Sequence, residues 1–268
     1  MRVLVATDLS EAGLLSIEAL LGCNPDLFDG VTLVHVIELD EYMAGGPIQE
    51  AINWARRRLA EEADSLKDAG FMTDYRLEQG AAADVVQSVA AEIGAELIIV
   101  TDRGKGGAPG RILGSTVERI AQAGEVPVLV ERVEERDAAW CRLGKGSPFA
   151  RPLVATDVDE TLKHLAMVAG RLPGTEATRV VHVTSPNAAM KEAQDFIEVE
   201  IMRTPLREAE VVVVEGRDPA EVVIAEAQAW GATVIVLAPR RHGVIGRLVL
   251  GSVARSLLKD GRVPLLFA

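Results

Sequence analysis

The sequence predicts an α/β protein with two similar domains in tandem, each built on an open, doubly wound, five-stranded parallel sheet. The first observation is an internal repeat, because Leu4–Asp8 and Leu153–Asp157 both read Leu-Val-Ala-Thr-Asp. Gly114-Ser115 and Gly251-Ser252 also open matching helical runs, and each run leads into a strand that contains Val-Pro. The second observation is the alternation of apolar strands with helical stretches, which is typical of a parallel sheet covered by helices.

The chain has 268 residues, enough for two domains of ordinary size. We expect a first domain at residues 1–133, a linker at 134–150 and a second domain at 151–268. The linker prediction depends on a charged stretch that runs into Gly144-Lys-Gly-Ser-Pro148. Two similar domains imply an intramolecular pseudo-dimer. Its last strands, 126–130 and 263–267, would pair with each other or, as the alternative, with a second chain in a homodimer.

In the first half, short apolar runs predict strands at 3–6, 31–37, 72–78, 97–100 and 126–130. Ser10 is a suitable N-cap for a helix that ends near Leu21, and Pro47 suits the first position of the next helix. That second helix carries an apolar stripe from Ile48 to Leu66 and is closed by Gly70. Two further helices are expected at 82–93 and 115–123, with loops at 38–46 and 101–113.

The second half repeats this order. Strands are expected at 153–155, 179–183, 210–214, 233–237 and 263–267. Helices are expected at 160–172, 187–203, 219–230 and 252–259, and Asp159 is the expected cap of the first. Residues 238–250 are expected to form a loop.

Composition narrows the classes of function. A net charge of −12 argues against broad binding to nucleic acid or to acidic membrane surfaces. Cys23 and Cys141 lie far apart and have no ligand spacing, so we expect neither a disulfide framework nor a zinc site. A reduced, cytoplasmic setting follows from this cysteine usage. The apolar runs have the length of strands, so we expect no targeting segment and no membrane span.

The loop after the fourth strand of the first half has the composition of a phosphate cradle. Gly104 and its neighbouring glycines allow backbone N–H groups to approach an anion, and Arg103 adds positive charge. Gly114, Ser115 and Thr116 add the unpaired amides of a helix N-terminus and two hydroxyls. The alternative is an ordinary loop in which Ser115 is the N-cap and forms a capping box with Glu118.

Asp8 ends the first strand, where a carboxylate can accept a hydrogen bond from a ribose hydroxyl or a base amine. The alternative is that Asp8 takes part in capping the helix that starts beside Ser10. His35 and His182 occupy matching positions on the second strand of each half, among apolar neighbours. We interpret both as packed, hydrogen-bonded side chains.

Several catalytic motifs are missing. The chain has no Gly-x-x-x-x-Gly-Lys-Ser/Thr loop, no Gly-x-Gly-x-x-Gly after its first strand, and neither a nucleophile elbow nor His-Glu-x-x-His. We therefore predict no catalytic residue and no protein-held metal.

Together these motifs resemble the universal stress protein family in its tandem, two-domain form. The family pattern is a first strand ending in Asp, a fourth strand leading into Gly-x-x-Gly, nine residues, Gly-Ser/Thr, and a last strand containing Val-Pro. In the first half Gly104 matches the second glycine and Gly114-Ser115 follows Lys105–Leu113, whereas Thr101 replaces the first glycine. The resemblance implies an adenine-nucleotide alpha-hydrolase-like fold.

The resemblance also implies a set of binding residues. The backbone at Ala6, Thr7 and Val36 would flank adenine, and Asp8 would face adenine or ribose. The phosphates would lie near Thr101, Arg103, Gly104, Gly114, Ser115 and Thr116. In the second half Ala238 and Arg241 replace both loop glycines, so we expect the better site in the first half.

The implied function is that of a stress-response regulator or sensor that binds ATP or AMP, with or without Mg, and reads out to an unidentified protein partner. A nucleotide-free interaction or scaffold protein is one alternative. A slow ATPase is the other, with hydrolysis limited by the lack of an evident catalytic base.

Overall fold

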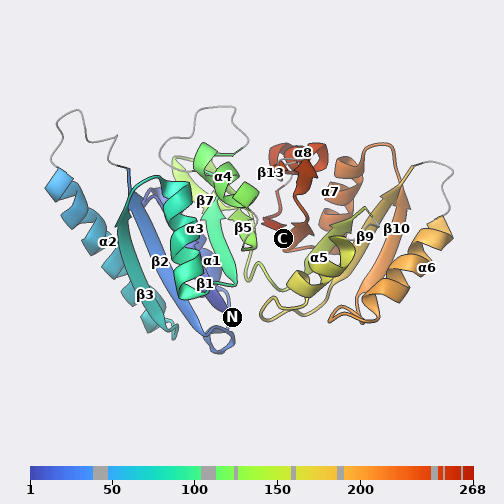
Figure 1. The fold of residues 1–268 in the computed structure, drawn as a ribbon, viewed down its shortest axis with the longest axis horizontal. Coiled ribbons are helices and arrows are strands. Elements are labelled where there is room, and N and C mark those ends of the chain that lie inside the picture. The colour runs from blue at the N-terminus through green and yellow to red at the C-terminus, as the bar shows by residue number, and fades with distance from the viewer. Residues whose placement is uncertain are drawn as a thin grey trace. The chain divides into compact units, whose positions relative to one another are not determined.

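The protein is described by a computed structural model, which covers residues 1–38, 48–103, 113–123, 126–157, 161–185, 190–242, 247–249, 251–260 and 262–268 (Figure 1). Contacts divide the chain into two compact units, unit 1 at Met1–Gly146 and unit 2 at Ser147–Ala268. Each unit is treated separately below.

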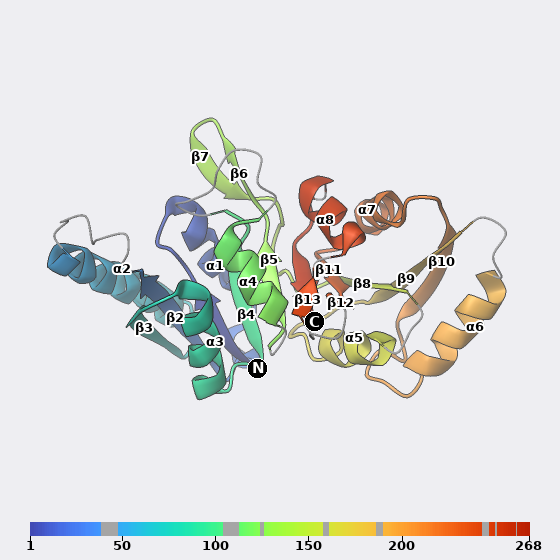
Figure 2. The same ribbon diagram turned by 45° about the horizontal axis from the view of Figure 1, so that its top comes forward.

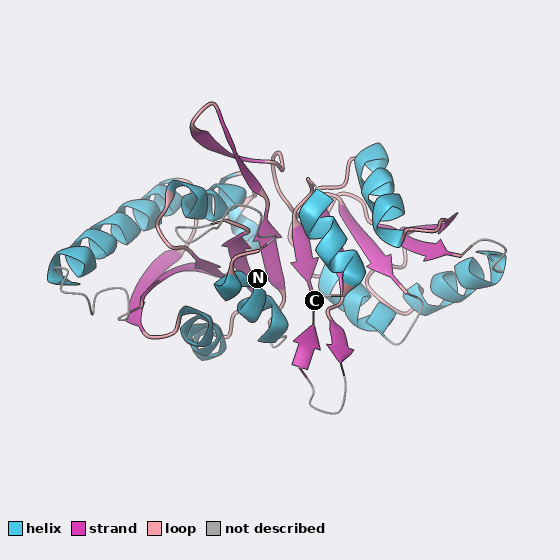
Figure 3. Ribbon diagram, turned by 90° about the horizontal axis from the view of Figure 1, so that it is seen from above, coloured by secondary structure: helices cyan, strands magenta, loops and turns pink. Residues whose placement is uncertain are grey.

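Unit 1 is built on five parallel strands in the order β3-β2-β1-β4-β5. The strands are β1 (Arg2–Ala6), β2 (Gly30–Ile37), β3 (Thr73–Gln79), β4 (Leu97–Thr101) and β5 (Val128–Glu131). The helices are α1 (Glu11–Leu21), α2 (Ile48–Asp68), α3 (Ala82–Ile93) and α4 (Ser115–Ala123), with a short 3₁₀ turn at Pro25–Leu27. Helices α1 and α2 cover one face of this sheet, and α3 and α4 cover the other (Figure 3).

Burial explains this arrangement. Strands β4 and β5 are buried along their whole length, as expected for apolar strands covered on both faces. The edge strand β3 instead carries charged residues, which discourage pairing with another chain. Helix α2 turns a narrow stripe of Ala55, Leu59, Ala63 and Leu66 toward the sheet, at the spacing of one helix face.

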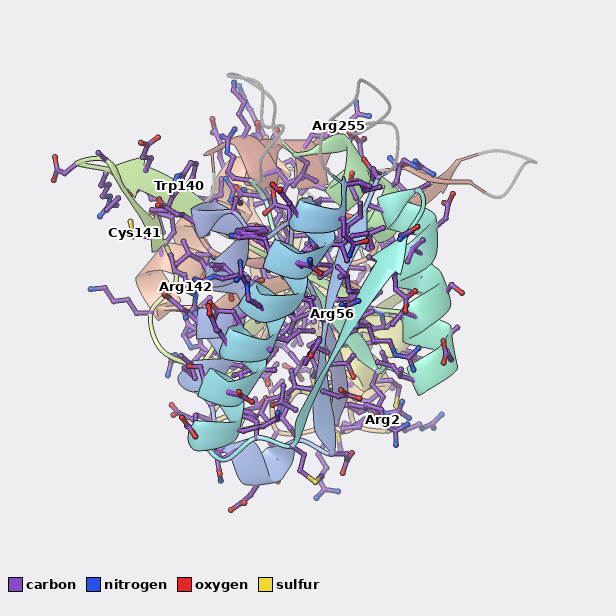
Figure 4. All side chains as sticks on the ribbon, turned by 90° about the vertical axis from the view of Figure 1, so that its left-hand side faces the viewer. Arg2, Arg56, Trp140, Cys141, Arg142 and Arg255 are labelled. Carbon is purple, nitrogen blue, oxygen red and sulfur yellow. The ribbon has the colours of Figure 1, made fainter. Side chains whose placement is uncertain are left out.

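Unit 1 continues past its sheet into a second, antiparallel element. Strands β6 (Val133–Arg136) and β7 (Ala139–Arg142) form a hairpin that extends beyond the sheet (Figure 2). The apolar side chains of Val133 and Trp140 pack against Ala12 and Leu15 of α1. Figure 4 shows Trp140, Cys141 and Arg142 succeeding one another along β7 beside that helix. The segment expected to be a linker therefore includes an ordered hairpin that belongs to unit 1.

Unit 2 repeats the strand order of unit 1, as β10-β9-β8-β11-β14, with all five strands parallel. They are β8 (Pro152–Thr156), β9 (Arg179–Thr184), β10 (Glu210–Glu215), β11 (Val234–Leu237) and β14 (Leu265–Phe267). The helices are α5 (Thr161–Ala169), α6 (Met190–Ile201), α7 (Pro219–Trp230) and α8 (Ser252–Asp260). The predicted fold class, two doubly wound five-stranded parallel sheets in tandem, is confirmed.

Three details of unit 2 differ from the sequence prediction. Helices α5 and α6 end at Ala169 and Ile201, two or three residues earlier than expected. Prolines follow closely in the chain, at 173 and 205, and disfavour the helical conformation in the residues before them. The expected loop 238–250 contains a small antiparallel pair, β12 (Arg240–His242) and β13 (Arg247–Val249). Asp159 lies outside the described residues.

No helix in the part of the chain that the structure describes is both long enough and apolar enough to span a membrane.

Candidate functional site

The strand order of unit 1 creates a switch point between β1 and β4. The chain leaves β1 toward β2 and β3 on one side and then returns to the other side of β1 to form β4. In open sheets of this kind ligands bind beyond the carboxyl ends of the strands at such a switch. Val5 pairs with Ile99, and Ala6 pairs with Val34, so β1, β2 and β4 end at the same edge of the sheet.

This edge gathers most of the predicted adenine-side residues. Ala6 ends β1, Thr7 and Asp8 follow it, and Val36 lies near the end of β2. The Thr7 N–H donates to the Val34 carbonyl at 3.0 Å, which continues the β1–β2 ladder one residue past β1. Thr101 ends β4, and its hydroxyl donates to the Arg103 carbonyl at 2.7 Å, which makes a tight turn. Gly104 lies outside the described residues.

Asp8 takes part in the start of helix α1. Its Oδ1 accepts hydrogen bonds from the Ser10 N–H at 3.0 Å and from the Ser10 hydroxyl at 2.6 Å. The Ser10 hydroxyl oxygen in turn accepts from the Gly13 N–H at 3.0 Å, which confirms the predicted N-cap. Asp8 therefore takes part in capping α1, as the alternative interpretation predicted. Its carboxylate has further lone pairs that can accept from other donors.

The two strand-2 histidines behave as predicted. His35 Nδ1 donates to the Thr7 carbonyl at 2.9 Å, and His182 Nδ1 donates to the Thr156 carbonyl at 2.8 Å. Both rings are half-buried. In each unit the same hydrogen bond fixes the backbone where the first strand ends. The histidines are therefore structural supports of the edge.

Helix α4 brings its N-terminus to the candidate phosphate end. The Glu118 N–H donates to the Gly114 carbonyl at 3.0 Å, so Gly114 is the N-cap and Ser115 is the first helical residue. The interpretation of Ser115 as the N-cap is wrong by one position, because the backbone of Gly114 already accepts the first helical bond. Ser115 is exposed and Thr116 is half-buried. A Cβ at Gly114 would meet none of the described residues within 4 Å.

A buried charged cluster lies directly behind this edge, and the sequence analysis did not identify it. Asp102 follows Thr101, is almost fully buried, and lies 3.0 Å from the Nε of Arg132. Its Oδ1 also accepts from the Val133 N–H at 3.1 Å, which joins the end of β4 to the hairpin. Burial raises the pKa of Asp102, against the opposing charge of Arg132. Its signal in the sequence was an Asp directly after an apolar strand, the same pattern that pointed to Asp8.

The neighbouring pair is more deeply buried. Glu131 has no exposed side-chain surface, and its two oxygens accept from Arg142 Nη2 and Nε at 3.1 and 3.3 Å. Burial raises the pKa of Glu131 more than the charge of Arg142 lowers it. Because Arg142 lies on β7, this pair attaches the second strand of the hairpin to β5. Among the described residues no group of three or more His, Cys, Asp or Glu side chains is arranged to hold a metal ion.

Unit 2 keeps part of this edge. The Arg255 N–H donates to the Gly251 carbonyl at 3.0 Å, so α8 starts on a glycine as α4 does. Asp157 follows β8 and is exposed. Ile98 of β4 and Ile235 of β11 pair with equivalent residues of the last strand of their units. Pro239 follows Ile235 by four residues, as Asp102 follows Ile98, so Pro239 is the counterpart of Asp102. The buried acid behind the unit 1 edge is therefore missing from unit 2.

Comparison with known proteins agrees with the duplicated fold. The model of the universal stress protein family matches residues 1–132 and 149–268. A crystal structure of a universal stress protein from Archaeoglobus fulgidus is similar over 100% of this chain and 97% of its own, with a TM-score of 0.72 and 23% identity. A functionally unknown protein from Pseudomonas aeruginosa PAO1 has a TM-score of 0.67 and 16% identity, over 99% of this chain and 91% of its own.

A putative universal stress protein from Pseudomonas aeruginosa UCBPP-PA14 has a TM-score of 0.65 at 16% identity, over 99% of this chain and 92% of its own. At sequence identities of 16% to 23%, these similarities show a shared fold and nothing more. No curated protein sequence matches this chain significantly. The family model nevertheless covers nearly the whole chain in two copies, and the chain therefore belongs to the universal stress protein family.

Proposed function

We propose that unit 1 binds an adenine nucleotide, ATP or AMP, and that the protein acts as a stress-response regulator or sensor. The observation that carries the proposal is the strand-order switch of unit 1, where the ends of β1, β2 and β4 meet at one edge. The chain that leaves this edge after β4 continues into α4, whose N-terminus begins with a glycine and two hydroxyl residues.

The α4 N-terminus suits phosphate. The first-turn amides of a helix have no helical acceptor, and the helix dipole favours negative charge there. Ser115 and Thr116 add hydroxyl donors, and no described residue lies where a side chain of Gly114 would, which would let a phosphate group approach the backbone. Arg103 would supply positive charge at the end of β4 in a protein whose net charge is −12.

The β1 and β2 ends suit the nucleoside. Backbone groups of Ala6, Thr7 and Val36 would flank the adenine ring, and Asp8 would accept from a ribose hydroxyl or from the base. Asp8 is held in place by Ser10, so little conformational entropy is lost when it binds a ligand. Magnesium would enter with ATP, bound to the phosphates.

Nucleotide binding would change the surface of unit 1 by connecting several of its elements. One nucleotide would bridge the start of α1, the end of β2 and the start of α4, and would favour the arrangement that fits it best. A partner protein would read the resulting surface. No residue of unit 1 is assigned as a general base, so we expect at most slow hydrolysis of ATP.

The proposal is tested by isothermal titration of ATP and AMP, with magnesium, into wild type and Gly114→Trp. Gly114 has no positive φ and a Cβ there meets no described residue within 4 Å, so we expect the fold to tolerate an indole that fills the phosphate position. The matched control is Gly251→Trp, because Gly251 caps α8 in unit 2 as Gly114 caps α4. Circular dichroism would verify that both variants are folded.

The expected result is one nucleotide per chain in wild type and in Gly251→Trp, with binding lost in Gly114→Trp. Loss only in Gly251→Trp would move the site to unit 2. Absence of heat with both nucleotides, in protein shown to carry no ligand from purification, would reject nucleotide binding and favour a scaffold role. Steady magnesium-dependent release of phosphate would favour the ATPase alternative.

A further inference from the structure

We propose that the outward face of helix α6, in unit 2, is a contact through which a second copy of this chain binds, with the two α6 helices antiparallel. This inference is independent of nucleotide binding. It concerns a helix surface that the packing of unit 2 leaves uncovered.

Helix α6 is apolar on two opposite sides. Ile197 and Ile201 are buried, and the helix packs through this side onto β10 and α5. On the opposite side Phe196 is 47% exposed, Val199 is 59% exposed, and Met202 directly after the helix is 69% exposed. An amphipathic surface helix normally carries polar residues on the side away from the core. In Figure 1 α6 lies at the margin of unit 2 beside β10.

The duplicated fold supplies an internal comparison. Helix α2 occupies the same place in unit 1, between the second and third strands of the sheet. Its exposed positions are polar or charged apart from Trp54. The fold therefore does not require apolar residues on the outside of this helix, and neighbouring exposed apolar residues are a common feature of contact surfaces.

Three residues of α6 and Arg203, two positions past its end, form one seam. Glu192, Phe196, Val199 and Arg203 are spaced by four, three and four residues, which places them on one stripe of a helix. The Met202 N–H donates to the Glu198 carbonyl at 3.1 Å, so the helical course continues almost to Arg203. The seam is about 16 Å long at the helical rise per residue.

The seam of one chain is complementary to the seam of a second chain that runs in the opposite direction. A twofold axis between Ile197 and Glu198 would place Phe196 on the partner's Val199 and Val199 on the partner's Phe196. The same axis would set Glu192 opposite the partner's Arg203. Among the described residues neither Glu192 nor Arg203 has an ion-pair partner within the chain. One symmetry operation therefore pairs both the apolar and the charged members of the seam.

One like-charged contact would arise at the side of the seam, where Asp195 approaches the partner's Glu200. Within each chain Lys163 of α5 lies 2.9 Å from Glu200 and would offset this repulsion. The seam is short, and small interfaces are typically weak. We therefore expect a dimer with a dissociation constant on the order of micromolar.

The experiment is sedimentation velocity of the full chain over a concentration series at ~0.15 M salt. Val199→Glu should shift the chain to monomer by inserting a charge at the centre of the seam. Glu192→Arg alone and Arg203→Glu alone should each weaken the dimer by roughly tenfold, since two charge pairs are lost in a twofold contact. The double variant Glu192→Arg with Arg203→Glu should restore wild-type affinity. Trp54→Gln on α2 is the matched control and should change nothing.

Rescue by the double charge reversal would support the proposal, because a residue that merely stabilises its own chain would not be rescued this way. A wild type that stays monomeric to about 0.5 mM would overturn it, since that is far above the expected dissociation constant. A dimer that tolerates Val199→Glu would overturn it as well and place the contact elsewhere. Binding of α6 to a basic helical peptide, with no self-association, would identify a different occupant and would also refute the proposal.

Discussion

At the scale of single residues, Gly13 allows Asp8 to approach the first turn of α1. A Cβ at residue 13 would overlap Asp8 Oδ1 and would lie 3.1 Å from Thr7 Oγ1 and 3.2 Å from Ser10 Oγ. The amide of Gly13 also donates to the Ser10 cap. The missing side chain therefore makes room for the cap and for the carboxylate that the nucleotide proposal uses.

We expect Gly13→Ala to lower the free energy of unfolding by about 1–3 kcal/mol, because the new methyl group displaces Asp8. This is the opposite of the usual helix preference, in which alanine is better than glycine by roughly 1 kcal/mol. Urea unfolding followed by circular dichroism measures the change. Gly114→Ala, where the added carbon meets no described residue within 4 Å, is the control and should lower the free energy of unfolding by no more than about 1 kcal/mol, the cost of alanine at an N-cap. An unchanged or higher stability of Gly13→Ala would contradict this account.

Glu131 makes the stability of unit 1 depend on pH. Burial raises its pKa above the ordinary value of 4.5, so the folded chain keeps this proton at a pH where the unfolded chain has lost it. The free energy of unfolding must then fall as pH rises from 4.5 through the folded pKa. Glutamine at this position has no proton to release.

The stability of wild type relative to Glu131→Gln should therefore be constant below pH 4.5 and decline as the pH rises through the folded pKa. Urea unfolding of both proteins between about pH 4 and about pH 8 measures this difference. Contributions from groups common to both proteins cancel. A difference that grows with rising pH would mean that Arg142 lowers the pKa of Glu131 more than burial raises it.

At the scale of elements, the β6–β7 hairpin connects both sides of the candidate site. It packs on α1 through Val133 and Trp140. Its Val133 N–H donates to Asp102 at the end of β4, and its Arg142 pairs with Glu131 of β5. Its two-residue turn, Asp137-Ala138, has φ values of 51° and 62°. Two successive left-handed residues are typical of the tight turns that join antiparallel strands, where Asn-Gly is the common sequence.

Ala138→Gly should raise the free energy of unfolding by about 0.5–1 kcal/mol, because an alanine in the left-handed region is strained and a glycine is not. Thermal and urea unfolding measure the gain. The neighbouring Ala139→Gly, on strand β7, should have the opposite sign, since glycine weakens a strand. Equal effects of the two substitutions would show that the turn geometry is not the cause.

At the scale of the whole molecule, one fold is used twice with different surfaces. Both units keep the strand order, the histidine bond to the first strand and a glycine at the start of the last helix. Among the described residues, the β6–β7 hairpin and the buried Asp102 belong to unit 1, and the apolar outward face of the second helix belongs to unit 2. This division suits the two proposals, a ligand site in unit 1 and a contact between chains in unit 2.

Much of this architecture was determined by the sequence alone. Continuous apolar runs such as Leu97–Val100 identify buried strands, and Ser10, Gly94 and Gly231 mark helix ends, because these signals act within a few residues. The repeated Leu-Val-Ala-Thr-Asp segment indicated the duplication. Asp8 was singled out because it ends the first strand, whereas Ala6, Thr7 and Val36 were named through the resemblance to the universal stress protein family.

Tertiary structure decided the rest. The hairpin was missed because its strands have four residues each and its turn lacks glycine, so its stability comes from packing on α1 and from distant ion pairs. Asp102 and Glu131 were not identified from the sequence, because only the fold buries them beside Arg132 and Arg142. The outward side of α6 could be recognised only after Ile197 and Ile201 had been placed against the core. Burial depends on which segments meet in space, and a pattern of local residue preferences does not contain that information.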